Sequence, residues 1–263
     1  MIKLIAADLD GTLLDSRKQL SPGLPALLRQ LSDKGIRFTP ASGRQYHNLI
    51  QLFPGLEHEL LFIAENGAMT VDRGKALFVD EIPLKDLQKP LEITRKAVGV
   101  YTVLAGEKTA YCEDDNPVFR ENAEMYYAKL THVPDLLEAA RHDRICKIAV
   151  FEKGNAERGC YRLLQPCTER FQVVLSGADW VDLMNPGVNK GHAMRELQRQ
   201  LGISPDECMA FGDYLNDVEL LESVTHSFAM ANAHPKLKAV SRHQAPSNDE
   251  DGVVRAVRDY LHL

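Results

Sequence analysis

The 263-residue chain lacks any apolar run long enough to cross a membrane. A membrane-spanning helix needs about 18 or more consecutive apolar residues, whereas the apolar residues here fall in short stretches. The first residues, MIKLIAADLDGT, also lack an apolar segment followed by a small-residue cleavage site. We therefore expect no membrane span and no signal peptide.

Paired cysteines and a surplus of basic residues are missing too. The five cysteines are scattered without a CxxC pair, a pattern that predicts reduced thiols in a cytoplasmic protein and argues against a disulfide framework or a zinc site. The net charge is −6 with both signs interspersed, which argues against a nucleic acid or an anionic membrane as partner. No coiled-coil or sustained apolar stripe indicates an oligomeric state.

Strand and helix signals alternate at both ends of the chain. Helical spacing of leucines follows a predicted helix start at Ser21-Pro22, and a later helical face ends at Gly202. This alternation predicts an α/β fold with a Rossmann-like, doubly wound parallel sheet. The expected strands of this sheet cover residues 3–7, 36–42, 60–64 and 208–211, with helices at 45–53 and 253–261.

In the middle of the chain the order of predicted elements changes, and hairpins are mixed with helices. We expect this segment, residues 83–186, to be a second domain with a largely antiparallel sheet, inserted into a core of residues 1–82 and 187–263. Its predicted strands cover residues 100–104, 109–112, 144–151 and 172–175.

Two aspartates follow the first predicted strand, in the segment Asp8-Leu9-Asp10-Gly11-Thr12. Ligands of open α/β sheets bind beyond the carboxyl ends of the strands, so this is a favourable place for chemistry. A carboxylate nucleophile can attack phosphorus, and a second acid can protonate the leaving alkoxide and later activate water. An Asp-x-Asp pair alone could equally be a loop with a helix cap, but the attached Gly-Thr favours the functional interpretation.

Three further clusters lie in the predicted core. Ser42-Gly43-Arg44 ends the second strand and could bind an anion at a helix N-terminus, although a plain Ser cap is the simpler interpretation. Lys190-Gly191 could neutralise phosphate charge, although a lone Lys is usually solvated. Asp213, Asn216 and Asp217 follow a strand, and their hard oxygens suit Mg²⁺, whereas the simpler alternative is a capped loop.

Taken in order, the segments DLDGTL, ASGR, NKG and GDYLND resemble the four motifs of the haloacid dehalogenase superfamily. The insertion is similar to the type IIB α/β cap of the Cof-type branch, and the flanking segments resemble bacterial sugar-phosphate phosphatases. Leu220-Leu221 stands where relatives often carry a Met. That departure concerns packing and leaves the motif residues intact.

The resemblance implies a role for each motif residue. It implies Asp8 as nucleophile and magnesium ligand, and Asp10 as general acid/base that offers its backbone carbonyl to the metal. Asp213 would be the second carboxylate on Mg²⁺. The implied phosphate contacts are Ser42, Gly43, Lys190 and Asn216, and the implied supporting residues are Thr12, Arg44, Asp217 and Asn248.

The expected activity is Mg²⁺-dependent hydrolysis of a small-molecule phosphomonoester through an aspartyl phosphate on Asp8, with sugar phosphates as the first substrate class. Phosphorylated cofactors such as flavin mononucleotide or pyridoxal phosphate stay open as substrates. A phosphosugar mutase is a second enzymatic interpretation. A module that accepts or binds phosphate without turnover is the non-enzymatic one.

Overall fold

The computed structural model describes residues 1–56 and 58–263, which form two compact units. The first unit comprises Met1–Gly43, Leu52–Lys75 and Asn189–Leu263. The second comprises Arg44–Gln51 and Ala76–Val188. Both ends of the chain therefore build the first unit. The assignment of a core to residues 1–82 and 187–263 and of a cap to 83–186 stays a prediction.

The first unit holds seven strands of an eight-stranded sheet, in the order β14-β13-β12-β1-β2-β3-β4. All neighbours from β14 to β3 are parallel, and β4 runs antiparallel to β3. This sheet confirms the predicted α/β fold with a parallel core. Its strands are β1 (Leu4–Asp8), β2 (Arg37–Ala41), β3 (Leu61–Ala64), β4 (Met69–Asp72), β5 (Lys75–Val79), β12 (Cys208–Gly212), β13 (His226–Met230) and β14 (His243–Ala245).

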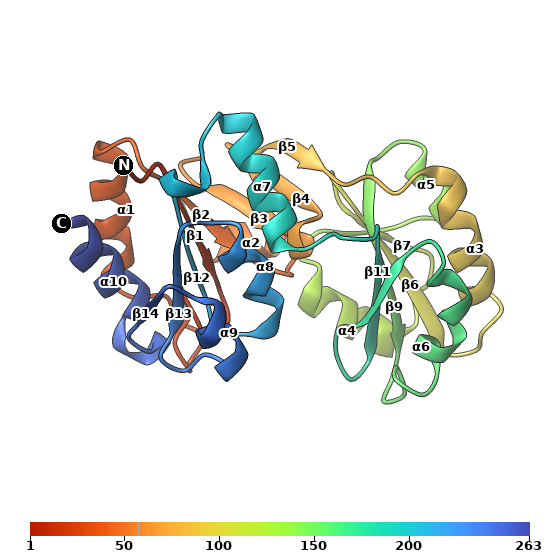
Figure 1. The fold of residues 1–263 in the computed structure, drawn as a ribbon. Helices are drawn as coiled ribbons and strands as arrows, with labels where there is room; N and C mark the ends of the chain where they lie inside the picture. The colour runs from red at the N-terminus through yellow and green to blue at the C-terminus, as the bar shows by residue number, and fades with distance from the viewer. Residues whose placement is uncertain (57) are drawn as a thin grey trace. The chain divides into compact units, whose positions relative to one another are not determined.

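Helices cover both faces of this sheet, with α1 and α10 on one side and α7 and α8 on the other (Figure 1). Each buries an apolar stripe; α1, for example, turns Leu24, Leu27 and Leu31 inward at helical spacing. The helical elements are α1 (Leu24–Asp33), α7 (Lys190–Leu201), α8 (Val218–Glu222), α9 (Pro235–Val240) and α10 (Gly252–Leu261), with short 3₁₀ turns η1 (Glu65–Gly67), η3 (Pro205–Glu207), η4 (Leu215–Asp217) and η5 (Asn248–Glu250).

Helix α1 begins later than the sequence predicts. Its N-cap is Gly23, and Pro25 occupies the first turn. Ser21 instead closes a turn before the helix, because its hydroxyl accepts a hydrogen bond from the amide of Gly23 (3.1 Å). The helix start predicted from Ser21-Pro22 was therefore two residues too early. The end of α7 was predicted correctly, since Gly202 takes the left-handed conformation (φ 64°) that glycine favours at this position.

The second unit contains a six-stranded sheet with the order β10-β11-β9-β6-β7-β8. Its pairs are antiparallel except β7–β8, which is parallel. Two strands, β8 and β11, were not predicted. The strands are β6 (Val100–Gly106), β7 (Ala110–Cys112), β8 (Leu130–His132), β9 (Ile145–Glu152), β10 (Gln172–Leu175) and β11 (Trp180–Met184). The helical elements are α2 (Tyr46–Gln51), α3 (Leu84–Thr94), α4 (Pro117–Tyr126), α5 (Leu136–Ala140), α6 (Cys160–Leu163) and η2 (Gln165–Cys167).

Strand β11 escaped prediction because every one of its five residues is buried. A strand that is buried on both faces loses the alternation of polar and apolar residues that identifies a half-exposed strand. Trp180, the first residue of β11, contacts the rings of Tyr126, Tyr127 and Phe151. Within the described residues, none of the helices is both long and apolar enough to traverse a bilayer.

Strand β1 lies inside the first sheet, between β12 and β2. It is buried along its whole length, and its last residue, Asp8, is in register with Ala41 of β2. On the other side, Ala7 is in register with Phe211 of β12. Because these strands are parallel, the segments that follow Asp8, Ala41 and Gly212 emerge at one edge of the sheet.

We predict that Gly191→Ala destabilises the first unit. An added Cβ would lie 2.1 Å from the backbone oxygen of Glu219 in α8, so α7 would have to move away. Such overpacking typically lowers the free energy of unfolding by about 1–3 kcal/mol. Urea unfolding followed by circular dichroism measures the change. Gly177→Ala is the matched control, because a Cβ there meets nothing within 4 Å; equal stability of both variants would contradict the prediction.

Candidate active site

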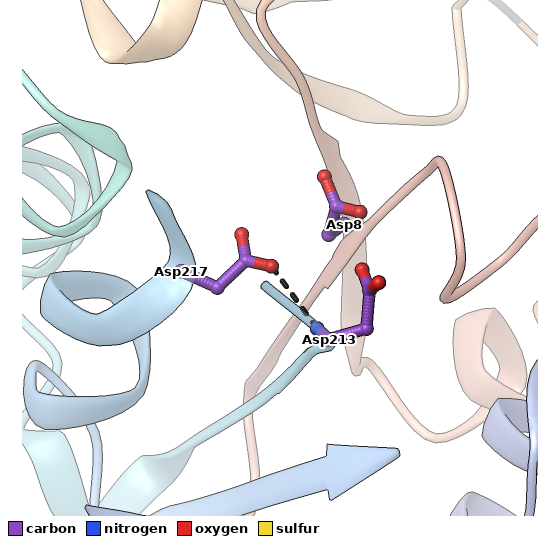
Figure 2. Close-up of side chains that lie close together, drawn as sticks. All are labelled: Asp8, Asp213 and Asp217. Atoms are coloured by element: carbon purple, nitrogen blue, oxygen red, sulfur yellow. Dashed lines mark hydrogen bonds between the residues drawn. The ribbon is translucent and has the colours of Figure 1, made fainter. Parts of the chain in front are cut away.

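Three aspartates meet at the carboxyl edge of the parallel strands. Asp8 ends β1, Asp213 follows β12, and Asp217 ends the 3₁₀ turn η4. One carboxylate oxygen from each lies within 4.8 Å of the others. Figure 2 shows Asp8 and Asp213 side by side, with the Asp217 side chain approaching from the neighbouring turn.

Lys190 joins two of these carboxylates. Its ammonium donates to Oδ1 of Asp8 and to Oδ1 of Asp217, the latter at 2.7 Å. The Lys190 and Asp217 side chains are 1% and 0% exposed. Asn189 caps α7, with its side chain accepting from the amide of His192 at 2.7 Å, and this cap fixes the start of the helix that carries Lys190.

The loop after β12 is held by hydrogen bonds from two sides, one set made by Asp217 and one bond made by Thr12. Oδ2 of Asp217 accepts from the backbone amides of Asp213 (3.1 Å) and Tyr214 (3.3 Å). The hydroxyl of Thr12 donates to Oδ1 of Asp213 at 3.2 Å. Gly11 has φ 89°, and a Cβ there would lie 2.4 Å from Oδ2 of Asp213. Only glycine therefore allows the first loop to approach this carboxylate so closely.

Burial dominates the electrostatics of the cluster. It raises the pKa of Asp8 to about 8; Lys190 opposes this rise, and the negative charges of Asp217 and Asp213 add to it. Burial also raises the pKa of Asp213, again with a contribution from Asp217. For Lys190, burial alone would lower the pKa, but the two carboxylates outweigh it and the pKa is raised.

This donor set fits a divalent cation. When its three carboxylates are ionised, the cluster with its one ammonium carries a formal charge of −2 in a largely buried space, and a bound cation would favour that ionised state. Hard carboxylate oxygens are the ligands that Mg²⁺ prefers, and Mg²⁺ usually takes only one or two of them. Because Asp217 already accepts from Lys190 and from two backbone amides, Asp8 and Asp213 are the carboxylates better suited to hold the ion.

Asp10 has a different environment from Asp8. Its side chain is 41% exposed and pairs with the ammonium of Lys18 at 2.8 Å. Lys18 lies in a turn ordered by Asp15, whose carboxylate accepts from the amides of Arg17 and Gln19. Lys18 was not predicted as a site residue, because nothing in the spacing of the motif distinguishes it from other surface lysines.

The second motif forms a buried turn beside η1. The amide of Ser42 donates to the backbone oxygen of Ile63 at 2.9 Å, and the amide of Asn66 donates to the oxygen of Ser42 at 3.0 Å. A Cβ on Gly43 would lie 2.8 Å from Oδ1 of Asn66. The backbones of Glu65 and Asn66 both have positive φ, 50° and 55°. Such strain in ordinary residues concentrates at functional sites, so Asn66 joins the candidate residues.

Three other predicted residues are placed as follows. Arg44 clusters with the second compact unit, Asn216 is exposed on η4, and Asn248 begins η5. The amide nitrogen of the Asn248 side chain donates to the backbone oxygen of Leu14 at 2.9 Å. Asn232, which the sequence analysis did not single out, donates to the oxygen of Gly11 at 2.8 Å. It lies just after β13, a strand that was not predicted, so no signal in the sequence distinguishes it from other loop asparagines.

Comparison with known proteins gives consistent matches over the full length. A model of the haloacid dehalogenase-like hydrolase family matches residues 5–257. The chain is 35% identical to the 5-amino-6-(5-phospho-D-ribitylamino)uracil phosphatase YbjI of Escherichia coli, covering 99% of this chain and 96% of that one.

Solved structures share the fold. One from Eubacterium rectale is 28% identical, covers 98% of this chain and 99% of its own, and superposes with a TM-score of 0.87. The subclass IIB sugar phosphatase BT4131 has a TM-score of 0.75 at 21% identity over 99% of this chain and 100% of that one, which is evidence for the fold alone. The chain therefore belongs to the haloacid dehalogenase-like hydrolases, as its four motifs predicted, and is an enzyme of their phosphatase type.

Proposed function

We propose that the chain is a Mg²⁺-dependent phosphomonoester hydrolase that works through an aspartyl phosphate on Asp8. The observation that carries this proposal is the buried contact of Lys190 with Asp8 inside a cluster able to hold a divalent cation. A nucleophilic carboxylate must approach a dianionic phosphate, so positive charge beside it is essential. Lys190 and a cation on Asp8 and Asp213 supply that charge.

Each residue has a defined task in the proposed reaction. An oxygen of Asp8 attacks phosphorus in line with the leaving oxygen, and the bond from phosphorus to that oxygen breaks. Asp10 gives its proton to the leaving alkoxide, and then as a carboxylate takes a proton from the water that attacks the acyl phosphate. This second attack releases inorganic phosphate and regenerates Asp8.

Charge stabilisation is divided among several groups. Mg²⁺ bound to Asp8, Asp213 and the backbone carbonyl of Asp10 would supply Lewis-acid stabilisation of the phosphoryl oxygens. Lys190, Ser42, Gly43 and Asn216 are assigned to the phosphoryl group. Thr12 and Asp217 keep Asp213 in place through their hydrogen bonds. Arg44 and Asn248 are assigned supporting roles.

Sugar phosphates are the first substrate class that we propose. The relative YbjI is named for a substrate that joins a phosphorylated ribityl chain to a uracil ring. This name favours a second candidate class for our chain, a polyol phosphate bearing a heterocyclic ring. Flavin mononucleotide and pyridoxal phosphate remain members of the panel to be tested, and selection among leaving groups is assigned to the second unit.

We expect Asp8→Asn to lose turnover by roughly a thousandfold or more, because the amide cannot form the acyl phosphate. The fold should persist, since Lys190 retains its contact with Asp217. Phosphate release and circular dichroism measure the two properties, with Asp33→Asn, an exposed residue at the end of α1, as the matched control. Substantial turnover in a folded Asp8→Asn protein would refute the covalent mechanism.

We expect Mg²⁺ to stabilise the protein even when no substrate is present. A ligand that binds only the native state adds about 2.7 kcal/mol when its concentration is about 100 times Kd. Thermal unfolding with Mg²⁺ and with chelator should therefore differ by several degrees. Asp213→Asn should remove most of this difference, and Asp33→Asn should retain it. An equal Mg²⁺ effect in both variants would contradict the assignment of Asp213.

Product analysis should find inorganic phosphate and no isomeric phosphosugar. The panel comprises sugar phosphates, a ribityl-type polyol phosphate, flavin mononucleotide, pyridoxal phosphate and an aryl phosphate, each with Mg²⁺ and with chelator. Release of an isomer would point to a mutase. A stable acyl phosphate without turnover would point to a phospho-accepting module.

A further inference from the structure

We propose that Asn232 is a positioning residue for Asp10 and so controls proton delivery to the leaving group. The proposal rests on the role of Asp10 in the proposed function. Asn232 lies two residues after the end of β13, at the same sheet edge as Asp8 and Asp213. It has no counterpart among the residues of the four motifs.

The side chain of Asn232 joins two separate loops. Its amide nitrogen donates to the backbone oxygen of Gly11 at 2.8 Å. Its oxygen accepts from the backbone amide of Asn248 at 3.2 Å. One amide group thus uses both its donor and its acceptor, which fixes its own orientation as well as that of Gly11.

A second set of contacts holds the later residues of the loop that follows β1. The side chain of Asn248 donates to the backbone oxygen of Leu14 at 2.9 Å, and the carboxylate of Asp249 accepts from the amide of Ser16 at 2.7 Å. The segments that follow β13 and β14 therefore hold the backbone of the loop after β1, at Gly11, Leu14 and Ser16.

The contact at Gly11 lies beside Asp10. Gly11 has φ 89°, a conformation that glycine enters freely, and backbone hydrogen bonds from the amides of Thr12 and Leu14 to the oxygen of Leu9 fold the loop around it. Asp10 is bonded directly to Gly11, and its partially exposed ion pair with Lys18 is of a kind that contributes little order. The bond from Asn232 to the Gly11 oxygen adds an anchor from outside the loop, one residue from Asp10, and this anchor restricts the direction of Asp10.

Two substrates with different leaving groups can distinguish a loss of proton delivery by Asp10 from a general disruption of the site. An alkoxide is a poor leaving group and requires a proton from Asp10, whereas a nitrophenolate leaves readily without one. Loss of proton delivery should therefore reduce kcat/KM for an alkyl phosphate much more than for an aryl phosphate. General disruption of the site would lower both.

The experiment measures kcat/KM for an alkyl sugar phosphate and for p-nitrophenyl phosphate at saturating Mg²⁺. Asn232→Asp removes the donor to Gly11 and preserves the size of the side chain. Asp10→Asn gives the reference for lost proton delivery. Asn122→Asp is the matched control, because the Asn122 amide also donates to a backbone oxygen at 2.8 Å, that of Val118 in α4.

We expect Asn232→Asp to lower the alkyl value about 100-fold and the aryl value less than about fivefold, within the range that general acid catalysis contributes. Asp10→Asn should show the same selectivity, and Asn122→Asp should show neither loss. The Mg²⁺ concentration for half-maximal rate should stay unchanged in Asn232→Asp. If Asn232→Asp does not fold, Asn232→Ala removes the amide donor without adding charge or another donor.

The possible outcomes separate the two proposals. A selective loss in Asp10→Asn with an equal loss, or none, on both substrates in Asn232→Asp would overturn the positioning role and leave the proposed function standing. Equal losses on both substrates in Asp10→Asn would instead overturn the acid/base role of Asp10, and the positioning role with it. A selective loss in Asn122→Asp would also count against Asn232.

Discussion

The rest of the site depends on the buried ion pairs that the Lys190 ammonium makes with Asp8 and Asp217. Without this ammonium, Asp8 and Asp217 would place two carboxylates in a space from which water is nearly excluded. Removing one partner of such a buried ion pair typically costs about 3–5 kcal/mol, because a charge is left uncompensated. Several features keep this ammonium in place. Asn189 caps the start of α7, α7 packs closely against α8 at Gly191, and β1, which carries Asp8, lies inside the sheet.

Much of the fold and part of the site could be predicted from the sequence alone. Short apolar runs identified β1, β2, β3 and β12 to within about a residue. The rule that ligands bind at the carboxyl ends of parallel strands indicated a site after β1, and the resemblance of the motifs then implied that Asp8 and Asp213 lie close together. Lys190 carried a weak signal by itself, and only its place in the ordered motifs gave it weight. The comparisons confirmed the family and the phosphatase class.

Other features depend on tertiary contacts that local sequence does not encode. The Ser21-Pro22 signal misplaced the start of α1 because the serine closes a turn instead of capping the helix. Strand β11 was missed because complete burial hides its alternation. Asn232 could not be ranked above other loop asparagines, since its partner Gly11 lies 221 residues away in the chain. Asn66 was missed in the same way, because its backbone amide donates to the oxygen of Ser42, in another segment of the chain.

The order of strands in the first sheet has a consequence for how the protein is made. Strand β1 needs β12 as a neighbour, and Thr12 meets Asp213 across 201 residues of chain. During synthesis, Asp8 emerges early, and Lys190, Asp213 and Asp217, which lie close to it in the folded protein, emerge late. The second unit is nearly continuous in sequence. Its sheet can therefore form before β12, the neighbour of β1, has been synthesised. Contacts between distant segments form slowly, and the ribosome must therefore release most of the chain before the enzyme has any catalytic centre.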